Sequence, residues 1–243
     1  MIYTIRTETG KRAHNEEYGY IPAESNALPF IAVSDGMGGH AAGEVASKMT
    51  INGVLEQLRH CHEDNPVSAL RRAISRVNLD VYRTAQDSES LRGMGATLVC
   101  AVLGSRRYVV ANVGDSRLYH FDGETMEQVT TDHSLVEMLV QSGSISREEA
   151  RTHPRRNVIT RAIGIGLSVD IDLFDRSWKP DDVLLLCSDG LCGSVTDERL
   201  CSILRQGGSL DVLADTMVRE ALQNGSSDNI TVLLARCERG GCA

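Results

Sequence analysis

The sequence has few aromatic residues and no excess of positive charge. Phe, Trp and Tyr together make up 4% of its 243 residues, and the formal net charge at pH 7 is −8. Proteins that hold nucleic acid or an anionic membrane present clustered cations, and single-stranded nucleic acid also needs aromatic stacking platforms. We therefore expect neither nucleic acid nor a charged membrane surface as the main partner.

Long apolar runs and paired cysteines are also missing. No stretch approaches the ~18 apolar residues of a membrane span, and the opening MIYTIRTETGKR lacks the apolar segment of a signal peptide. The seven cysteines form no C-x-x-C pair, and Cys100 and Cys187 lie in apolar runs, as small buried side chains do. The sequence predicts a reduced, cytoplasmic protein without a membrane span.

What remains is the composition of a globular chain, with 42% hydrophobic and 24% charged residues. It contains no repeat or low-complexity linker, so we expect one catalytic domain over residues 1–243. Apolar and alternating runs predict strands at 30–34, 96–103, 108–113, 117–121, 125–130, 169–174, 183–188 and 230–236. Periods of three and four residues predict helices at 41–58, 66–85, 196–206 and 209–224. Because strands and helices come in blocks, we expect an α+β fold with antiparallel sheets, interrupted by a polar excursion at 134–156.

Four aspartates adjoin these predicted strands. Asp35 follows FIAVS, Asp115 follows YVVANVG, Asp189 follows VLLLCS, and Asp228 lies just before ITVLLAR. Antiparallel neighbours bring the end of one strand and the start of the next to the same edge of a sheet. We therefore expect the four carboxylates to converge on one rim.

Crowded carboxylates repel one another unless cations are bound between them. Glu16 and Glu17 add two more oxygen donors near the N-terminus. A set made only of oxygen donors suits Mg²⁺ or Mn²⁺ better than Zn²⁺. One carboxylate bridging two such ions, about 3.5–4 Å apart, is an arrangement that serves phosphoryl hydrolysis. Each aspartate alone is also ordinary turn chemistry, so the combination carries the prediction.

Two other patterns are weaker. Residues 36–41, GMGGHA, fit a dinucleotide fingerprint, but Asp35 would point a carboxylate at the pyrophosphate and no βαβ alternation follows. Cys100 and Arg106 have the C-x5-R spacing of cysteine-dependent phosphatases, but Cys100 lies inside an apolar strand. We expect neither dinucleotide binding nor a cysteine nucleophile.

The ordered motifs resemble those of the metal-dependent protein serine/threonine phosphatases of the protein phosphatase 2C family, above all its bacterial members. They are RAHNEE at 12–17, SDGMGGH at 34–40, GMGAT at 93–97, VGDSR at 113–117, TDHS at 131–134, HPRRN at 153–157, SDG at 188–190 and DNIT at 228–231. The resemblance covers about residues 4–236. It implies a sandwich of two antiparallel sheets flanked by helix pairs, with metals at one end and a flap at about 136–156.

The resemblance also implies roles for individual residues. Asp35 would bridge two core ions, Asp115 would hold a weaker third ion, and Arg12 would clamp the substrate phosphate. A hydroxide between the core ions would attack phosphorus, so no covalent intermediate is needed. The full set of implied metal ligands is Glu16, Asp35, the Gly36 carbonyl, Asp115, Asp189 and Asp228. Asn229 and Glu17 would support these ligands.

Two positions bear on how the reaction would run. Glu17 stands where the family has an aspartate that orders metal-bound water, and its extra methylene changes the reach of the carboxylate. Met37 stands where animal members carry a histidine proposed as the general acid. Some acid must protonate the leaving serine oxygen. A water near Asp115 is the first candidate, and His40 is the second.

The sequence thus predicts hydrolysis of phosphoserine and phosphothreonine in proteins, dependent on Mn²⁺ or Mg²⁺. The expected partners are phosphorylated proteins, with a bacterial serine/threonine kinase as the opposing enzyme, and the chain is expected to be a monomer. One alternative is a stress-signalling phosphatase dedicated to a single partner. Another is a catalytically weak phosphoprotein-binding module, which the substitution at Glu17 motivates.

Overall fold

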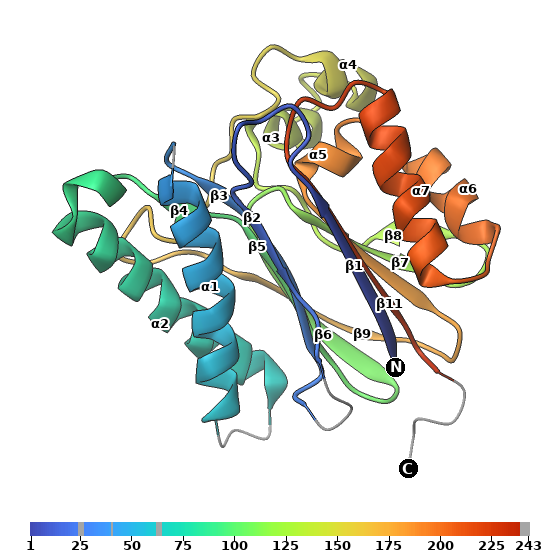
Figure 1. Cartoon of the computed structure of the whole chain (residues 1–243), viewed down its shortest axis with the longest axis horizontal. Helices are drawn as coiled ribbons and strands as arrows, with labels where there is room; N and C mark the ends of the chain where they lie inside the picture. The colour runs from blue at the N-terminus through green and yellow to red at the C-terminus, as the bar shows by residue number, and fades with distance from the viewer. Residues whose placement is uncertain (24–26, 40, 62–64, 239–243) are drawn as a thin grey trace.

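Two β-sheets pack face to face, and a pair of helices covers each outer side (Figure 1). The computed structural model describes residues 1–23, 27–39, 41–61 and 65–238. Within these ranges all strand pairings in both sheets are antiparallel. The strands are β1 Ile2–Glu8, β2 Glu17–Tyr20, β3 Phe30–Met37, β4 Gly95–Ala96, β5 Leu98–Leu103, β6 Arg107–Val113, β7 Arg117–Phe121, β8 Met126–Gln128, β9 Asp172–Ser177, β10 Val183–Cys187 and β11 Ile230–Arg236. The helices are α1 Ala41–Arg59, α2 Pro66–Asp87, the short 3₁₀ turn η1 Glu89–Leu91, α3 Leu135–Gln141, α4 Arg147–Thr152, α5 Asp189–Cys192, α6 Asp197–Arg205 and α7 Leu210–Gln223.

Each sheet mixes strands from distant parts of the chain. One sheet has the order β1-β11-β10-β7-β8, and the other has the order β2-β3-β5-β6-β9, with β4 paired to β3. The first and last strands are neighbours, with Ile2 opposite Arg236 and Glu8 opposite Ile230. The predicted α+β class, with two antiparallel sheets between helix pairs, is confirmed.

Alternation along the strands divides the core into layers. In β3, Phe30 and Ala32 face α1 and α2, whereas Ile31 and Val33 face the opposite sheet. Successive side chains of a strand point to opposite faces, so one apolar run can serve both layers. The third layer lies between the other sheet and α6 and α7, where Met217 is fully buried. This packing fixes the sheets relative to each other and thereby fixes the ends of their strands.

The helices begin and end close to the predicted residues because their signals are local. Asn65 caps α2 by accepting a hydrogen bond from the Val67 N–H at 2.9 Å, and Pro66 occupies the first turn. Among the described residues, no helix combines the length and the apolar character needed to cross a bilayer.

Several strand predictions differ from the structure. β3 was expected to end at residue 34 but continues through Gly36 to Met37, because these two residues pair with Ala96 and Gly95 of β4. β9 begins at Asp172 instead of residue 169. β1 and β2 were not predicted, because charged residues and a short length obscure their alternation; pairing with β11 and β3 forms them.

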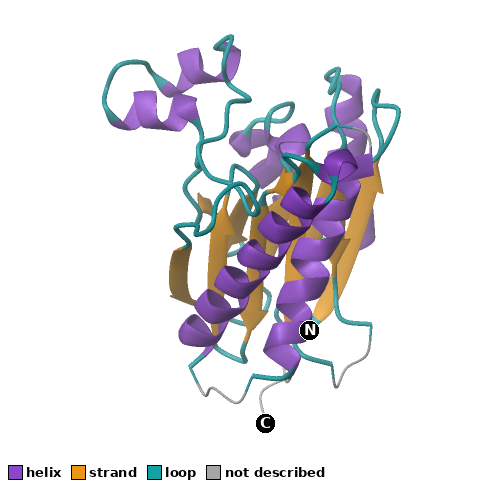
Figure 2. Cartoon of the chain, turned by 90° about the vertical axis from the view of Figure 1, so that its left-hand side faces the viewer, coloured by secondary structure: helices purple, strands orange, loops and turns teal. Residues whose placement is uncertain are grey.

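The polar excursion forms two short helices that project beyond the ends of the strands (Figure 2). Ser134 caps α3 and Ser146 caps α4, the latter in a reciprocal capping box with Glu149. At the base, Ser134 pairs with Ile159 in an isolated antiparallel bridge, and the Leu135 N–H donates to the Val158 carbonyl at 2.8 Å. We call residues 134–159 the flap.

Cys100 is an interior residue of β5 with no exposed surface. Burial raises the pKa of its thiol to about 12, so no thiolate nucleophile forms there near neutral pH. This agrees with the rejection of the C-x5-R pattern.

We predict that Cys100→Ala leaves kcat/KM for a small aryl phosphate within about threefold of wild type, because the thiol only fills space. The measurement is steady-state hydrolysis, with a melting curve to confirm folding. A folded but inactive Cys100→Ala variant would support Cys100 as the nucleophile and contradict the prediction.

Candidate metal centre

The four predicted aspartates meet at the end of the sandwich near the flap, but not along one sheet. Asp35 lies in β3 of one sheet, and Asp115 lies in the turn that leads from β6 of that sheet to β7 of the other. Asp189 and Asp228 adjoin β10 and β11 of the second sheet. The expectation of a single sheet edge is therefore corrected: the rims of both sheets supply the carboxylates. Their proximity depends on the packing of the two sheets.

Three carboxylates form the tightest group. Glu17 lies directly opposite Asp35 in the β2–β3 pairing, and Asp189 approaches from the first turn of α5. One carboxylate oxygen from each lies within 4.8 Å of the other two. Glu17, expected only to support the ligands, thus reaches the ligand cluster itself.

Glu16 and the Gly36 carbonyl occupy a neighbouring position. A Cβ on Gly43, in the first turn of α1, would lie 2.9 Å from both Glu16 Oε1 and the Gly36 oxygen. A Cβ on Gly36 would collide with the Gly43 carbonyl at 1.9 Å. Two glycines therefore let β3, α1 and the N-terminal loop approach closely, and they place Glu16 and the Gly36 carbonyl beside the same point.

Asn229 anchors the loop that carries these acidic residues. Its side-chain oxygen accepts the Glu16 N–H at 2.9 Å, and its amide donates to the carbonyls of Thr9 and His14 at 2.9 and 3.0 Å. Gly10, at φ +61°, passes so close that a Cβ would meet the Asp228 carbonyl at 2.2 Å. Asn229 thus holds the backbone of the loop that carries Glu16.

The Thr97 hydroxyl connects Asp35 to Ser116, the residue after Asp115. The Thr97 hydroxyl accepts the Asp35 N–H at 2.9 Å and shares a hydrogen bond with Ser116 at 2.8 Å. The Thr97 N–H in turn donates to the Asp35 carbonyl at 2.8 Å. Sequence reasoning missed these supports, although each lies inside a motif that it singled out.

Three buried carboxylate oxygens of this cluster lack a well-formed hydrogen bond. Neither oxygen of Glu17 nor Oδ1 of Asp189 has a well-formed hydrogen bond, although the hydroxyls of Thr231 and Ser188 lie near Glu17. Burial raises the pKa of Glu17 to about 8, and burial followed by the charge of Glu17 raises the pKa of Asp35 well above its usual range. Buried oxygens without donors are the groups that a divalent cation satisfies.

Burial and nearby carboxylates also raise the pKa values of Asp189 and Asp115. Burial and the neighbouring Asp228 raise the pKa of Asp189 to about 6, while burial and the charge of Asp189 raise that of Asp115 to about 8. The residues present therefore fit the oxygen-donor centre that the sequence predicted.

Arg12 lies at this centre and pairs with Asp228. Its Nη2 is 2.8 Å from Asp228 Oδ2, and 54% of its side chain is exposed. The positive charge of Arg12 also acts on Glu16 and Asp35. An exposed guanidinium beside the carboxylates can bind a phosphate through two N–H groups once it leaves Asp228.

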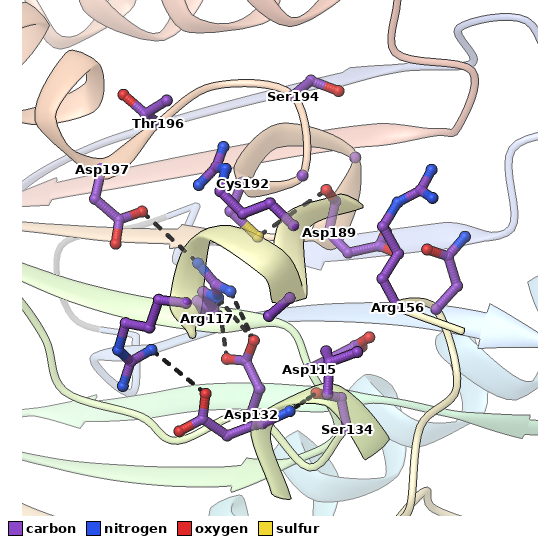
Figure 3. A pocket seen from close by; sticks show the side chains of 18 of the residues that line it. Asp115, Arg117, Asp132, Ser134, Arg156, Asp189, Cys192, Ser194, Thr196 and Asp197 are labelled. Atoms are coloured by element: carbon purple, nitrogen blue, oxygen red, sulfur yellow. Dashed lines mark hydrogen bonds and ion pairs between the residues drawn. The ribbon is translucent and has the colours of Figure 1, made fainter. Parts of the chain in front are cut away.

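A cavity of about 430 Å³ opens from Asp115, Asp189 and Asp228 and runs under the flap toward α6. Figure 3 shows Arg117 inside it, between Asp132 and Asp197. Its Nη2 is 2.7 Å from Asp132 Oδ2, so this half-buried cation is already neutralised. From the flap, α3 and α4 contribute lining residues that include Glu137, Val140, Arg147 and Arg151. His40, the second candidate acid, lies outside the described residues.

Comparisons with known proteins agree with this geometry. Residues 16–229 match the protein phosphatase 2C family. The serine/threonine phosphatase Stp of Listeria welshimeri is 40% identical over 239 residues, 96% of this chain and 95% of that protein. The crystal structure of Stp1 from Staphylococcus aureus has a TM-score of 0.90 at 38% identity, covering 98% of this chain and 95% of that chain. The catalytic domain of the phosphatase PstP, crystallised with two manganese ions, has a TM-score of 0.84 at 32% identity, covering 97% of each chain.

An antiparallel sandwich with an oxygen-donor carboxylate centre at one end defines a metal-dependent phosphohydrolase. The chain belongs to the protein phosphatase 2C family, and its activity is that of a metal-dependent protein serine/threonine phosphatase. The resemblance drawn from the motifs is confirmed, together with Mn²⁺ or Mg²⁺ as the class of cofactor.

We predict that the metal-free protein loses stability as the pH rises from about 5.5 to 8. The buried carboxyls have raised pKa values, so in this window the folded state binds more protons than the unfolded state, whose carboxyls have already ionised. Added Mg²⁺ should therefore raise the melting temperature more at pH 8 than at pH 5.5. Calorimetry with EDTA and with Mg²⁺ measures both effects.

Asp35→Asn serves as the internal control, because it removes one of the titrating groups and should flatten the pH dependence of the metal-free protein. A metal-free stability that is constant or rises over this window would contradict the prediction.

Proposed function

We propose that Glu16, Asp35, the Gly36 carbonyl, Asp189 and Asp228 hold two core divalent ions, with Glu17 beside them. The main support is the cluster of buried carboxylate oxygens without hydrogen-bond donors. Asp35 is suited to bridge, because its carboxylate clusters with those of Glu17 and Asp189 while its neighbour Gly36 lies close to Glu16. When bound, such ions supply the charge that makes water a nucleophile near neutral pH and stabilises the phosphoryl transition state.

The protein's own residues provide position and charge balance. Asn229 and Thr97 hold the backbones of Glu16 and Asp35, so these carboxylates do not have to reorganise. Arg12 orients the substrate phosphate after exchanging its ion pair with Asp228. Asp115, which faces the cavity, is proposed to hold a third, weaker ion and the water that protonates the leaving oxygen.

We further propose that the cavity receives the polypeptide that carries the phosphorylated residue. The cavity begins at the carboxylate centre and continues between the flap and α6, so it extends farther than a small phosphate ester would reach. Arg147 lines it and is only loosely paired with Glu137 at 3.4 Å, and Arg151 lines the same wall. Cations on a rim act mainly on charged or phosphorylated protein surfaces.

The cellular role follows from the activity. We propose that the whole chain acts as one monomeric catalytic domain in the cytoplasm, where it reverses the work of a serine/threonine kinase. No described residue favours the dedicated stress-signalling alternative. The weak-module alternative is disfavoured because the Glu17 carboxylate lies in the same cluster as Asp35 and Asp189.

We predict that Asp35→Asn lowers kcat by about 100-fold or more at saturating Mn²⁺, roughly 2.7 kcal/mol in the barrier, because one change weakens both core sites. Excess EDTA should abolish wild-type activity in the same assay. Glu56→Gln, an exposed carboxylate on α1, is the matched control and should behave as wild type. If Asp35→Asn keeps more than about a tenth of wild-type kcat, Asp35 is not the bridge.

We predict that replacing both Arg147 and Arg151 with Ala spares a small aryl phosphate but raises KM for a phosphopeptide severalfold. The peptide penalty should shrink as salt is added, because the interaction is electrostatic. The double replacement of Arg71 and Arg83, both exposed on α2, removes the same charge away from the cavity and is the control. Equal effects on the two substrates, or an equal effect of the control, would assign the flap arginines no part in substrate binding.

A further inference from the structure

His133 lies outside the carboxylate cluster, yet it contacts the turn that carries Asp115. The Gly114 backbone N–H donates to His133 Nδ1 at 3.0 Å. The backbone N–H of His133 donates in return to the Gly114 carbonyl at 2.9 Å. Gly114 adopts φ +112°, a conformation that side chains resist, and a Cβ there would also strike Thr97 at 2.6 Å. The reciprocal pair of hydrogen bonds therefore holds an unusual backbone conformation one residue before Asp115.

The partners of His133 define which ring nitrogen carries its proton. Nδ1 accepts from the Gly114 N–H, so a neutral ring carries its hydrogen on Nε2. Nε2 lies 3.1 Å from Asp172 Oδ2 and 3.2 Å from Arg161 Nη1. Arg161 Nη1 bonds the other oxygen of Asp172 at 2.9 Å and so fixes that carboxylate. A chain of contacts thus runs from Arg161 through Asp172 and His133 to the backbone at Asp115.

The same residue closes the base of the flap. The Thr160 N–H donates to the His133 carbonyl at 2.7 Å, and the next residue, Ser134, forms the bridge to Ile159. Among the described contacts, the only hydrogen bond of the Asp115 carboxyl is with its own backbone N–H, so the direction of the carboxyl follows from its backbone. His133 is therefore the point at which flap, edge strand β9 and the Asp115 turn are joined.

We propose that His133 is a positioning residue: with Asp172 and Arg161 it holds the Gly114–Asp115 turn so that the Asp115 carboxylate can take a divalent ion. The inference rests on the metal role proposed for Asp115. Hydrogen-bond partners behind metal ligands contribute about 10- to 100-fold to metal affinity. If His133 only filled space, the loss of the hydrogen bond at one ring nitrogen would have the same effect on Mn²⁺ binding as the loss at the other.

Two substitutions separate the nitrogens. His133→Asn keeps an acceptor near the position of Nδ1, whereas His133→Gln keeps a polar group only near the position of Nε2. We expect His133→Gln to weaken the weaker Mn²⁺-binding step about tenfold. His133→Asn keeps the acceptor for the Gly114 N–H but loses the contact with Asp172, so we expect it to weaken the step distinctly less. Calorimetric titration with Mn²⁺ measures this step without turnover. The Gly114 amide resonance in ¹⁵N-labelled protein should shift strongly in the Gln variant and little in the Asn variant.

Three further variants make the result decisive. Asp115→Asn sets the size of the effect when the carboxylate itself is lost. His120→Gln, at a hydrogen-bonded histidine between Tyr108 and Asp182, controls for the general cost of the substitution and should leave the Mn²⁺ step unchanged. Asp172→Ala, at a half-buried residue on the edge strand, should weaken the step in the same direction and decides the question if His133→Gln does not fold.

The outcomes are distinct. Equal effects of His133→Asn and His133→Gln, or an unchanged Mn²⁺ step in His133→Gln or in its substitute Asp172→Ala while Asp115→Asn weakens it, would overturn the positioning role alone. An unchanged step in Asp115→Asn would overturn the metal role of Asp115 and the inference with it. The core centre at Asp35 would stand in either case.

Discussion

Mutual repulsion of buried carboxylates is the constraint around which this protein is organised. Glu17, Asp35 and Asp189 bring oxygens within 4.8 Å of one another, in a place where few donors compensate them. Such a group is unfavourable unless protons or cations neutralise it. The fold must therefore prevent these three side chains from moving apart. Two sheets locked by three apolar layers provide the scaffold for this.

The scaffold acts mainly on backbone. Gly36 and Gly43 permit an approach that any Cβ would prevent, and Asn229 secures the acidic loop through three hydrogen bonds. The carboxylates of Glu17 and Asp189 thus keep oxygens free of hydrogen bonds. The same is true at Asp115, where the hydrogen bond between Gly114 and His133 holds the main chain and not the carboxylate.

Much of this could be predicted from the sequence, because motif order and helix periodicity are local signals. Asp35, Asp189 and Asp228 were identified from their places beside apolar strands, and α1, α2, α6 and α7 from their spacing. The position of Glu17 was not predicted, because it depends on β2, a four-residue strand that only pairing with β3 creates. The role of His133 was equally hidden, because its partners lie 19 and 39 residues away in the chain.

The pairing of the first and last strands has a consequence for the life of the chain. Glu16 and Asp35 are made early, but Asp228 and the anchoring Asn229 arrive only with β11, which supplies the neighbour of β1. A chain that has not yet formed β11 therefore lacks the Asn229 anchor and Asp228. We expect the carboxylate centre to assemble only once β11 pairs with β1.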